Sequence, residues 1–223
     1  MTRIQLSRPT AVVFDLDGTL VDTAPDLGAA LNRLLAEHDR PGLALSEIRT
    51  MIGDGAAKLV ERGFSASGGY PVDPASLVSR FLVLYERSVA DLSRPFEGTM
   101  DMLQRLTDSG LLLGVCTNKP ARPTRQVLAA LGLERYFVAV AAGDGPARKP
   151  DPRHLLGVVE DLGAKPAATL MVGDSTNDVQ AARAAGAQSV VVTFGYTAIP
   201  PHELGADAVI ERFADLPGLI GLD

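Results

Sequence analysis

The sequence predicts an α/β protein with a Rossmann-like three-layer core around a parallel sheet, plus an inserted all-helical cap domain. Short apolar runs rich in β-branched residues alternate along the chain with segments of helical periodicity. These runs are continuously apolar, as in strands that helices cover on both faces of a parallel sheet. The stretch from about residue 22 to residue 94 interrupts this alternation and carries helical patterns only.

Six apolar runs are predicted as the core strands, and the segments between them as helices. One helix begins at Asp151, a good N-cap that is followed by proline, and continues to about Leu162. Another is predicted over 178–185 and ends at Gly186. Strand, helix and strand in repetition indicate an open sheet with right-handed crossovers. The six strand runs are 11–14, 111–116, 137–141, 169–172, 189–193 and 208–210.

The interrupting stretch is predicted to hold two long amphipathic helices. In the first, apolar residues recur at the i, i+3, i+4, i+7 and i+8 spacing of one helix face. The second begins at Asp73 and Pro74. We therefore expect a discontinuous core domain of residues 1–20 and 95–223, and a cap domain of residues 21–94. The apolar faces consist of Leu27, Ala30, Leu31, Leu34 and Leu35, and of Leu77, Phe81, Leu84 and Tyr85.

Length and composition limit the class of protein. The 223 residues include 21 Lys and Arg against 27 Asp and Glu, a formal net charge of −6. This acidic balance argues against a nucleic-acid binder that works by neutralising phosphates. The single cysteine, Cys116, excludes an internal disulfide, and no apolar run approaches the roughly 18 residues of a membrane span. We expect a soluble cytoplasmic protein, monomer or homodimer, without a signal peptide and without a nucleic-acid or membrane partner.

An acidic motif follows the first predicted strand. Because residues i and i+2 of an extended chain point the same way, Asp15 and Asp17 would aim two carboxylates into one crevice. Gly18 then lets the chain turn sharply. A calcium loop of the EF-hand type starting at Asp15 would need glycine and glutamate where Leu20 and Asp26 stand, so it is excluded. Ligands of open α/β sheets bind at the carboxyl ends of the strands, where this motif lies.

Three further strand ends carry polar groups that suit a phosphate or a metal ion. Thr117 and Asn118 offer a hydroxyl and a backbone N–H, and Lys149 stands on backbone that the next proline holds extended. Asp174 follows the fourth strand run, and Asp178 lies one turn into the next helix. Each group alone is compatible with an ordinary turn, a surface lysine or a helix cap. Their joint appearance at four strand ends favours phosphate chemistry.

These groups permit a specific reaction. A carboxylate can attack phosphorus and form an acyl phosphate, while a second carboxylate protonates the leaving oxygen and later activates water. Magnesium prefers oxygen ligands and is often held by one or two carboxylates plus the substrate phosphate, which Asp15 and Asp174 could supply. Lys149 would add positive charge, worth about 4 kcal/mol for unit charges 4 Å apart at an effective dielectric of 20.

Together these motifs resemble the four ordered motifs of the haloacid dehalogenase superfamily, and the helical insert resembles its helical cap. The resemblance implies that Asp15 is the nucleophile and Asp17 the general acid and base. It further implies a Mg²⁺ site formed by Asp15, the Asp17 backbone carbonyl and Asp174, with Asp178 as an indirect partner of the metal. Thr117, Asn118 and Lys149 would bind the phosphoryl group. The motifs are Asp15-x-Asp17-Gly18-Thr19, Thr117-Asn118, Lys149-Pro150 and Gly173-Asp174-Ser175-x-x-Asp178.

Within this superfamily, the stretches 18–23, 52–56 and 117–120 resemble the phosphoglycolate phosphatases. This resemblance implies Mg²⁺-dependent hydrolysis of 2-phosphoglycolate, a small anionic phosphorylated metabolite. Two glycines flank a cap loop that could close over such a substrate and set substrate choice, and cap cations could meet its carboxylate. A solvated helix face explains the cations equally well. The loop is Gly53, Asp54 and Gly55, and the cations are Arg49, Lys58 and Arg62.

Two other functions stay open at this point. A phosphatase or mutase for a sugar phosphate would use similar machinery on the same fold. A phosphorelay receiver, a signalling module, also uses an acceptor aspartate, an acidic metal site, a threonine and a lysine. Receivers are about half this length, and they lack both the helical insert and an acid two residues beyond the acceptor.

Overall fold

The six core strands form one parallel sheet in the order β5-β4-β1-β6-β7-β8. The structure is a computed structural model and describes residues 6–70 and 73–222. β1 is central, with Phe14 opposite Val115 of β4 and Val172 of β6, so the carboxyl ends of three strands lie side by side. The predicted parallel sheet is confirmed. The strands are β1 (Ala11–Phe14), β4 (Leu112–Cys116), β5 (Ala139–Ala141), β6 (Thr169–Gly173), β7 (Gln188–Val192) and β8 (Ala208–Ile210).

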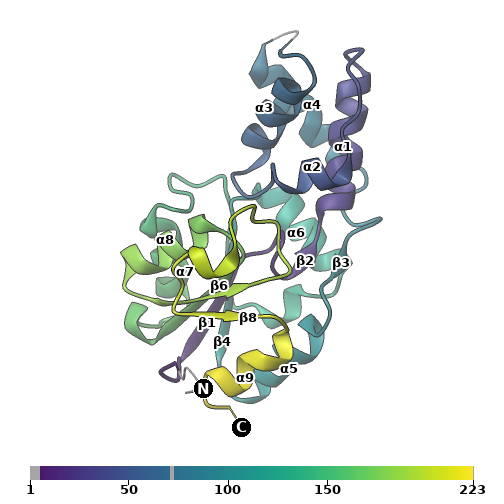
Figure 1. The fold of residues 1–223 in the computed structure, drawn as a ribbon. Helices are drawn as coiled ribbons and strands as arrows, with labels where there is room; N and C mark the ends of the chain where they lie inside the picture. The colour runs from purple at the N-terminus through teal and green to yellow at the C-terminus, as the bar shows by residue number, and fades with distance from the viewer. Residues whose placement is uncertain (1–5, 71–72, 223) are drawn as a thin grey trace.

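Helices cover both faces of the sheet and complete three layers (Figure 1). Val12 and Phe14 of β1 belong to a core cluster with α5, α6 and α9, whereas Ala11 and Val13 pack against α7 and α8. Both faces of β1 are therefore buried, which explains its continuously apolar sequence. The helices are α5 (Thr99–Asp108), α6 (Ala121–Ala130), α7 (Pro152–Asp161), α8 (Thr176–Ala185) and α9 (Leu216–Leu219), and short 3-10 turns lie at Glu134–Tyr136, Pro166–Ala168, Pro201–Glu203 and Phe213–Asp215.

Local capping sets where the helices behind the sheet begin. The Asp151 carboxylate accepts a hydrogen bond from the N–H of Arg153 at 3.0 Å, so α7 begins where the sequence predicts. α8 begins two residues before the predicted start, because Ser175 and Asp178 form a capping box that makes Asp178 the third residue of the helix. Gly186, with φ of 75°, ends α8 as predicted.

The insert after β1 is helical and has an apolar core of its own. Its four helices gather at the end of the molecule away from both termini (Figure 1). Leu31, Phe64 and Phe81 are among their fully buried side chains. The predicted all-helical cap is thereby confirmed. Its helices are α1 (Ala24–Ala36), α2 (Leu45–Arg49), α3 (Ala56–Ala66) and α4 (Pro74–Tyr85).

Two short strands join the cap to the core. β2 (Val21–Asp22) pairs antiparallel with β3 (Arg94–Pro95) at the two crossings between the domains. The sequence did not predict this pairing, because two-residue strands carry no apolar run that a pattern could reveal. Beside it, buried Asp26 accepts hydrogen bonds from the N–H of Leu92 and from the N–H and hydroxyl of Ser93. The domain boundaries at 20/21 and 94/95 stay predictions; the first falls directly before β2 and the second inside β3.

All helices of the described chain are short. α1, with 13 residues, is the longest of those in residues 6–70 and 73–222. None of the helices in these ranges has both the length and the apolar character required to traverse a bilayer.

Candidate active site

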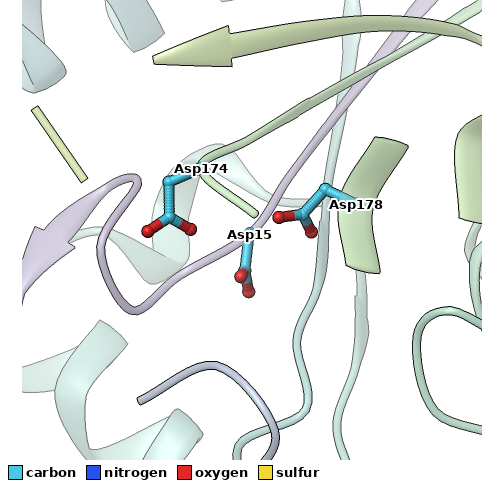
Figure 2. Close-up of side chains that lie close together, drawn as sticks. All are labelled: Asp15, Asp174 and Asp178. Atoms are coloured by element: carbon cyan, nitrogen blue, oxygen red, sulfur yellow. The ribbon is translucent and has the colours of Figure 1, made fainter. Parts of the chain in front are cut away.

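Three buried carboxylates meet at the carboxyl ends of β1 and β6. Asp15 directly follows β1, Asp174 directly follows β6, and Asp178 lies in the first turn of α8. Figure 2 shows the three side chains close together, and one oxygen from each lies within 4.8 Å of the others. The topology therefore brings together three of the aspartates that the sequence predicts for the site.

Burial makes this cluster electrostatically costly without a cation. It raises the pKa of Asp15 to about 6; the positive charge of Lys149 opposes this, and the negative charges of Asp178 and Asp17 reinforce it. Burial likewise raises the pKa of Asp174 well above its ordinary value, again with a contribution from Asp178 and Asp15. A divalent cation would remove both penalties. The all-oxygen donor set, the close approach and the raised pKa values fit a metal site.

Lys149 supplies the positive charge inside the cluster. Its ammonium lies 2.9 Å from Oδ1 of Asp15 and 2.7 Å from Oδ1 of Asp178. Burial lowers the pKa of Lys149, but the two carboxylates outweigh burial and hold it above its ordinary value. The lysine therefore stays charged between the carboxylates of Asp15 and Asp178, and its contact with a phosphoryl group stays a prediction.

Asn118 fixes the backbone of Lys149. Its side-chain oxygen accepts from the Lys149 N–H at 2.9 Å, and its side-chain N–H₂ donates to the Lys149 carbonyl at 2.9 Å. The side chain of Asn118 thus acts on the protein backbone, which leaves its own backbone N–H for the predicted phosphate contact. Thr117, at the end of β4, is buried and lines the same pocket as Asp15 and Asp17. Phosphate binding by Thr117 and Asn118 stays a prediction.

Asp17 is held by two donors. Its Oδ1 accepts from the hydroxyl of Thr23 at 2.7 Å, and both of its oxygens accept from the ammonium of Lys119, at 3.0 and 3.1 Å. The sequence reasoning missed Lys119, which is almost completely buried. The sequence did contain a signal for Lys119. Like Lys149, it follows a predicted strand and precedes a proline.

Asp174 is positioned by a segment that the sequence reasoning also missed. Its Oδ2 accepts from the backbone N–H of Tyr196 at 2.7 Å. The Tyr196 hydroxyl donates to Asp22 of β2 at 2.6 Å and accepts from the N–H of Ala24 at 3.0 Å. The segment after β7 thus joins the carboxylate cluster to the strand pair that leads into the cap. No local sequence pattern around Tyr196 predicts its contact with Asp174.

The predicted cap loop lies directly on the core. The Gly53 carbonyl accepts from the side-chain N–H₂ of Asn118 at 3.1 Å, and Asp54 accepts from that of Asn177 at 2.7 Å. Gly55 has φ of 87°, and a Cβ there would lie 3.1 Å from the Asn118 carbonyl oxygen. The loop therefore reaches the motif residues from the opposite domain. Its control of substrate choice stays a prediction.

The three cap cations bind partners within the protein. Arg49 forms an ion pair with Asp22 at 2.8 Å, and Lys58 forms an exposed pair with its helix neighbour Glu61. Arg62 donates to the Met51 carbonyl at 2.8 Å. Within residues 6–70 and 73–222, none of the three cations lines the pocket that contains Asp15 and Asp17. Binding of a substrate carboxylate by Arg49 stays a prediction, and this geometry does not support it.

Residues 12–192 match the family model of the haloacid dehalogenase-like hydrolases. The chain belongs to this family. The matched stretch contains all four motifs around the carboxylate cluster, so the family assignment and the geometry concern the same residues. The predicted resemblance is confirmed, and the protein is an enzyme of the hydrolase type.

Individual members of the family show the likeness in more detail. The chain is 46% identical to a phosphoglycolate phosphatase of Caulobacter vibrioides, over 92% of this chain and 88% of that one. It is 42% identical to a phosphoglycolate phosphatase of Agrobacterium fabrum, over 94% and 92% of the two chains. A crystal structure described as a predicted phosphoglycolate phosphatase from Haemophilus somnus superposes with a TM-score of 0.91 at 30% identity, covering 96% of this chain and 99% of that one.

Proposed function

We propose that the protein is a Mg²⁺-dependent phosphomonoesterase that hydrolyses 2-phosphoglycolate to glycolate and phosphate through an aspartyl phosphate on Asp15. One observation carries this proposal: buried Asp15 lies 2.9 Å from the Lys149 ammonium and faces Asp174 and Asp178, while Asp17 lines the same pocket. The substrate is supported by the relatives at 46% and 42% identity, both of which are phosphoglycolate phosphatases.

In the first half-reaction, a carboxylate oxygen of Asp15 attacks phosphorus, and the bond between phosphorus and the glycolate oxygen breaks. Oδ1 of Asp15 is held by the N–H of Leu16 at 2.7 Å and by Lys149, which fixes the direction of the carboxylate. Protonated Asp17 gives its proton to the leaving oxygen, so this oxygen departs as the hydroxyl group of glycolate and not as an alkoxide. Thr23 and Lys119 hold Asp17 in place for this transfer.

In the second half-reaction, water attacks phosphorus of the aspartyl phosphate. Asp17, now a carboxylate, accepts a proton from this water, the bond between phosphorus and Asp15 breaks, and phosphate is released. Lys149 and Thr117 would hold the phosphoryl oxygens in both steps, since phosphoryl transfer depends mainly on positioning and charge stabilisation. The enzyme thereby returns to its starting state.

Asp15, Asp174 and the Asp17 backbone carbonyl would hold the metal, and an all-oxygen set of this kind suits Mg²⁺. When bound, the ion supplies positive charge that offsets the repulsion between the Asp15 carboxylate and an anionic phosphate. Both oxygens of Asp178 are already engaged, by Lys149 at 2.7 Å and by the N–H and hydroxyl of Ser175 at 3.0 and 2.6 Å. We therefore assign Asp178 a positioning role at this site.

A phosphate-release assay tests the proposal. The substrates are 2-phosphoglycolate, glucose 6-phosphate and β-glucose 1-phosphate, each with Mg²⁺ and with a chelator. We expect 2-phosphoglycolate to give the highest kcat/KM, the chelator to abolish turnover, and Asp15→Asn to lose roughly four orders of magnitude in kcat while its circular dichroism stays unchanged.

Three results would contradict the proposal. Faster hydrolysis of a sugar phosphate would show that 2-phosphoglycolate is not the preferred substrate. Formation of an isomerised sugar phosphate in place of free phosphate would indicate a mutase. Protein that retains phosphate for minutes without turnover would indicate a receiver, which the hydrolase family match and the inserted cap already disfavour.

A further inference from the structure

The pocket beside Asp17 has an apolar wall formed by cap residues, and one polar residue from each domain lies in its lining. Lys119 and Tyr85 both line it, next to Asp17. Within the described residues 6–70 and 73–222, Lys119 is the sole cationic residue in this lining. The apolar part of the lining consists of Leu27, Ile52, Leu59, Phe81 and Leu82.

The Lys119 ammonium can bind more than Asp17. It carries three N–H donors, and the Asp17 carboxylate lies along one side, at 3.0 and 3.1 Å. The ammonium also lies 4.5 Å from the centre of the Tyr85 ring. The side chain of Lys119 is 2% exposed, and a buried ammonium is costly unless hydrogen-bonding partners satisfy it. This position therefore suits an additional anionic partner in the pocket.

The hydroxyl of Tyr85 is a buried donor with no partner. Tyr85 is 1% exposed and comes from the last turn of α4. Within residues 6–70 and 73–222, no group meets hydrogen-bond geometry with its hydroxyl, although the charge of nearby Lys119 opposes the rise that burial causes in the pKa of Tyr85. Buried polar groups in native proteins are almost always paired, so an unpaired hydroxyl that lines a ligand pocket indicates a partner on the ligand.

We propose that Lys119 and Tyr85 bind the carboxylate of the substrate, and that this pair selects phosphorylated 2-hydroxy acids over phosphate esters that lack a carboxylate. The inference rests on the proposed function and names the contact that determines specificity at the same site. It assigns the task to one core residue and one cap residue, so recognition of the carboxylate requires the two domains together.

The connectivity of the substrate supports this assignment. A general acid must come within roughly 2.6–3.2 Å of the oxygen that it protonates, so the leaving oxygen lies against Asp17. In a phosphorylated 2-hydroxy acid, one carbon separates that oxygen from the carboxylate. The carboxylate is then next to Asp17, where Lys119 already lies at 3.0 Å.

The apolar walls also disfavour the alternative substrates. A sugar placed at this position would bury several hydroxyl groups against leucine, isoleucine and phenylalanine side chains, which offer no hydrogen bonds. A short acid presents one charged group, and the two polar groups of the wall can satisfy it. The pocket thus favours a small carboxylate beyond the leaving oxygen.

A matched pair of esters tests the proposal. Ethyl phosphate has a methyl group where 2-phosphoglycolate has its carboxylate. We expect the ratio of kcat/KM for 2-phosphoglycolate to that for ethyl phosphate to fall by roughly tenfold to a hundredfold in Lys119→Met and by roughly threefold to tenfold in Tyr85→Phe. Lys119 also holds Asp17, so kcat will fall for both esters, and the ratio isolates the carboxylate contact.

Two controls accompany these variants. Lys165→Met removes an exposed lysine of the core and should leave the ratio unchanged, which excludes a general effect of protein charge. Tyr85→Phe removes an unpaired hydroxyl at nearly constant volume, so its melting temperature should equal or exceed that of the wild type. This variant keeps the test valid even where Lys119→Met fails to fold.

An unchanged ratio in Lys119→Met overturns the proposal, and an unchanged ratio in Tyr85→Phe overturns the part played by Tyr85. Failure of the proposed function gives a different result: the wild type then releases phosphate from neither ester. In that case, binding of 2-phosphoglycolate and of ethyl phosphate to Asp15→Asn, measured by calorimetry, decides the matter. Equal affinities would overturn the carboxylate site, whereas weaker binding of ethyl phosphate would support it.

Discussion

At the scale of single residues, the chemistry of the site depends on charged groups that are kept away from water. Asp15 lies in a cluster with two other carboxylates, and one lysine, Lys149, compensates part of their charge. Such a cluster costs folding free energy when no cation is bound, and the same arrangement favours binding of a metal ion and of an anionic substrate.

This cost predicts a pH dependence of stability in the metal-free protein. The pKa of Asp15 is raised from 3.8 to about 6, so between these values the folded state binds more protons than the unfolded state. The free energy of unfolding therefore decreases as the pH rises through this window, by about 3 kcal/mol in total. Asp15→Asn lacks this contribution.

Urea unfolding in chelator at pH 4 and pH 7 measures the effect. The stability of Asp15→Asn relative to the wild type should be greater at pH 7 than at pH 4 by about 2 kcal/mol. If the free energies of unfolding of the two proteins change equally with pH, the pKa of Asp15 is not raised by folding, and this account of the cluster is wrong.

Prediction from sequence succeeded for those residues whose role follows from local context. Asp15 and Asp174 stand directly after apolar strands, and Lys149 stands before a proline at another strand end. It failed for Lys119 and Tyr196, because their contacts join residues 102 and 22 positions apart. Burial of a lysine and the approach of a distant N–H are tertiary properties that no local pattern reports.

At the scale of elements, the strand ends and the segments that follow them build the site. β1, β4 and β6 are neighbours in the sheet, so the residues after them converge without any specific loop sequence. The segment after β7 then closes over Asp174, with almost no room between them. A Cβ on Gly195 would lie 2.2 Å from Cβ of Asp174 and 2.5 Å from its Oδ2.

Gly195→Ala should therefore displace either this segment or the carboxylate. We expect kcat/KM to fall at least about tenfold, a higher Mg²⁺ concentration for half-maximal activity, and a loss of about 1–3 kcal/mol in stability. Phosphate release titrated with Mg²⁺ and thermal unfolding measure these effects.

Gly157→Ala is the matched control. Gly157 lies on the exposed side of α7, and open space surrounds the position of its Cβ. This substitution should raise stability by about 0.5–1 kcal/mol and leave activity unchanged. Equal Mg²⁺ requirements in the two variants would contradict the role of Gly195.

At the scale of the whole molecule, two apolar cores are joined at the β2–β3 pair, and residues of the cap and of the strand ends line one pocket. The core clusters around β1, and the cap has a separate cluster that includes Leu31 and Phe81. The α/β core was predictable because its strands are continuously apolar, and the cap because one long stretch lacks such runs. The β2–β3 junction was not, since it depends on residues that only the folded chain brings together.

Covalent catalysis at Asp15 is tested most directly by trapping the phosphoryl enzyme. In Asp17→Asn the Asp15 carboxylate can still attack phosphorus, although more slowly because the leaving oxygen is no longer protonated. The base that activates water for the second step is absent, so the intermediate should accumulate. We expect an acid quench within the first turnover of 2-phosphoglycolate with Mg²⁺ to leave one phosphoryl group on the peptide that contains Asp15, detected by mass spectrometry and removed by hydroxylamine. Phosphate release without any phosphorylated peptide, or phosphorylation of another residue, would contradict this mechanism.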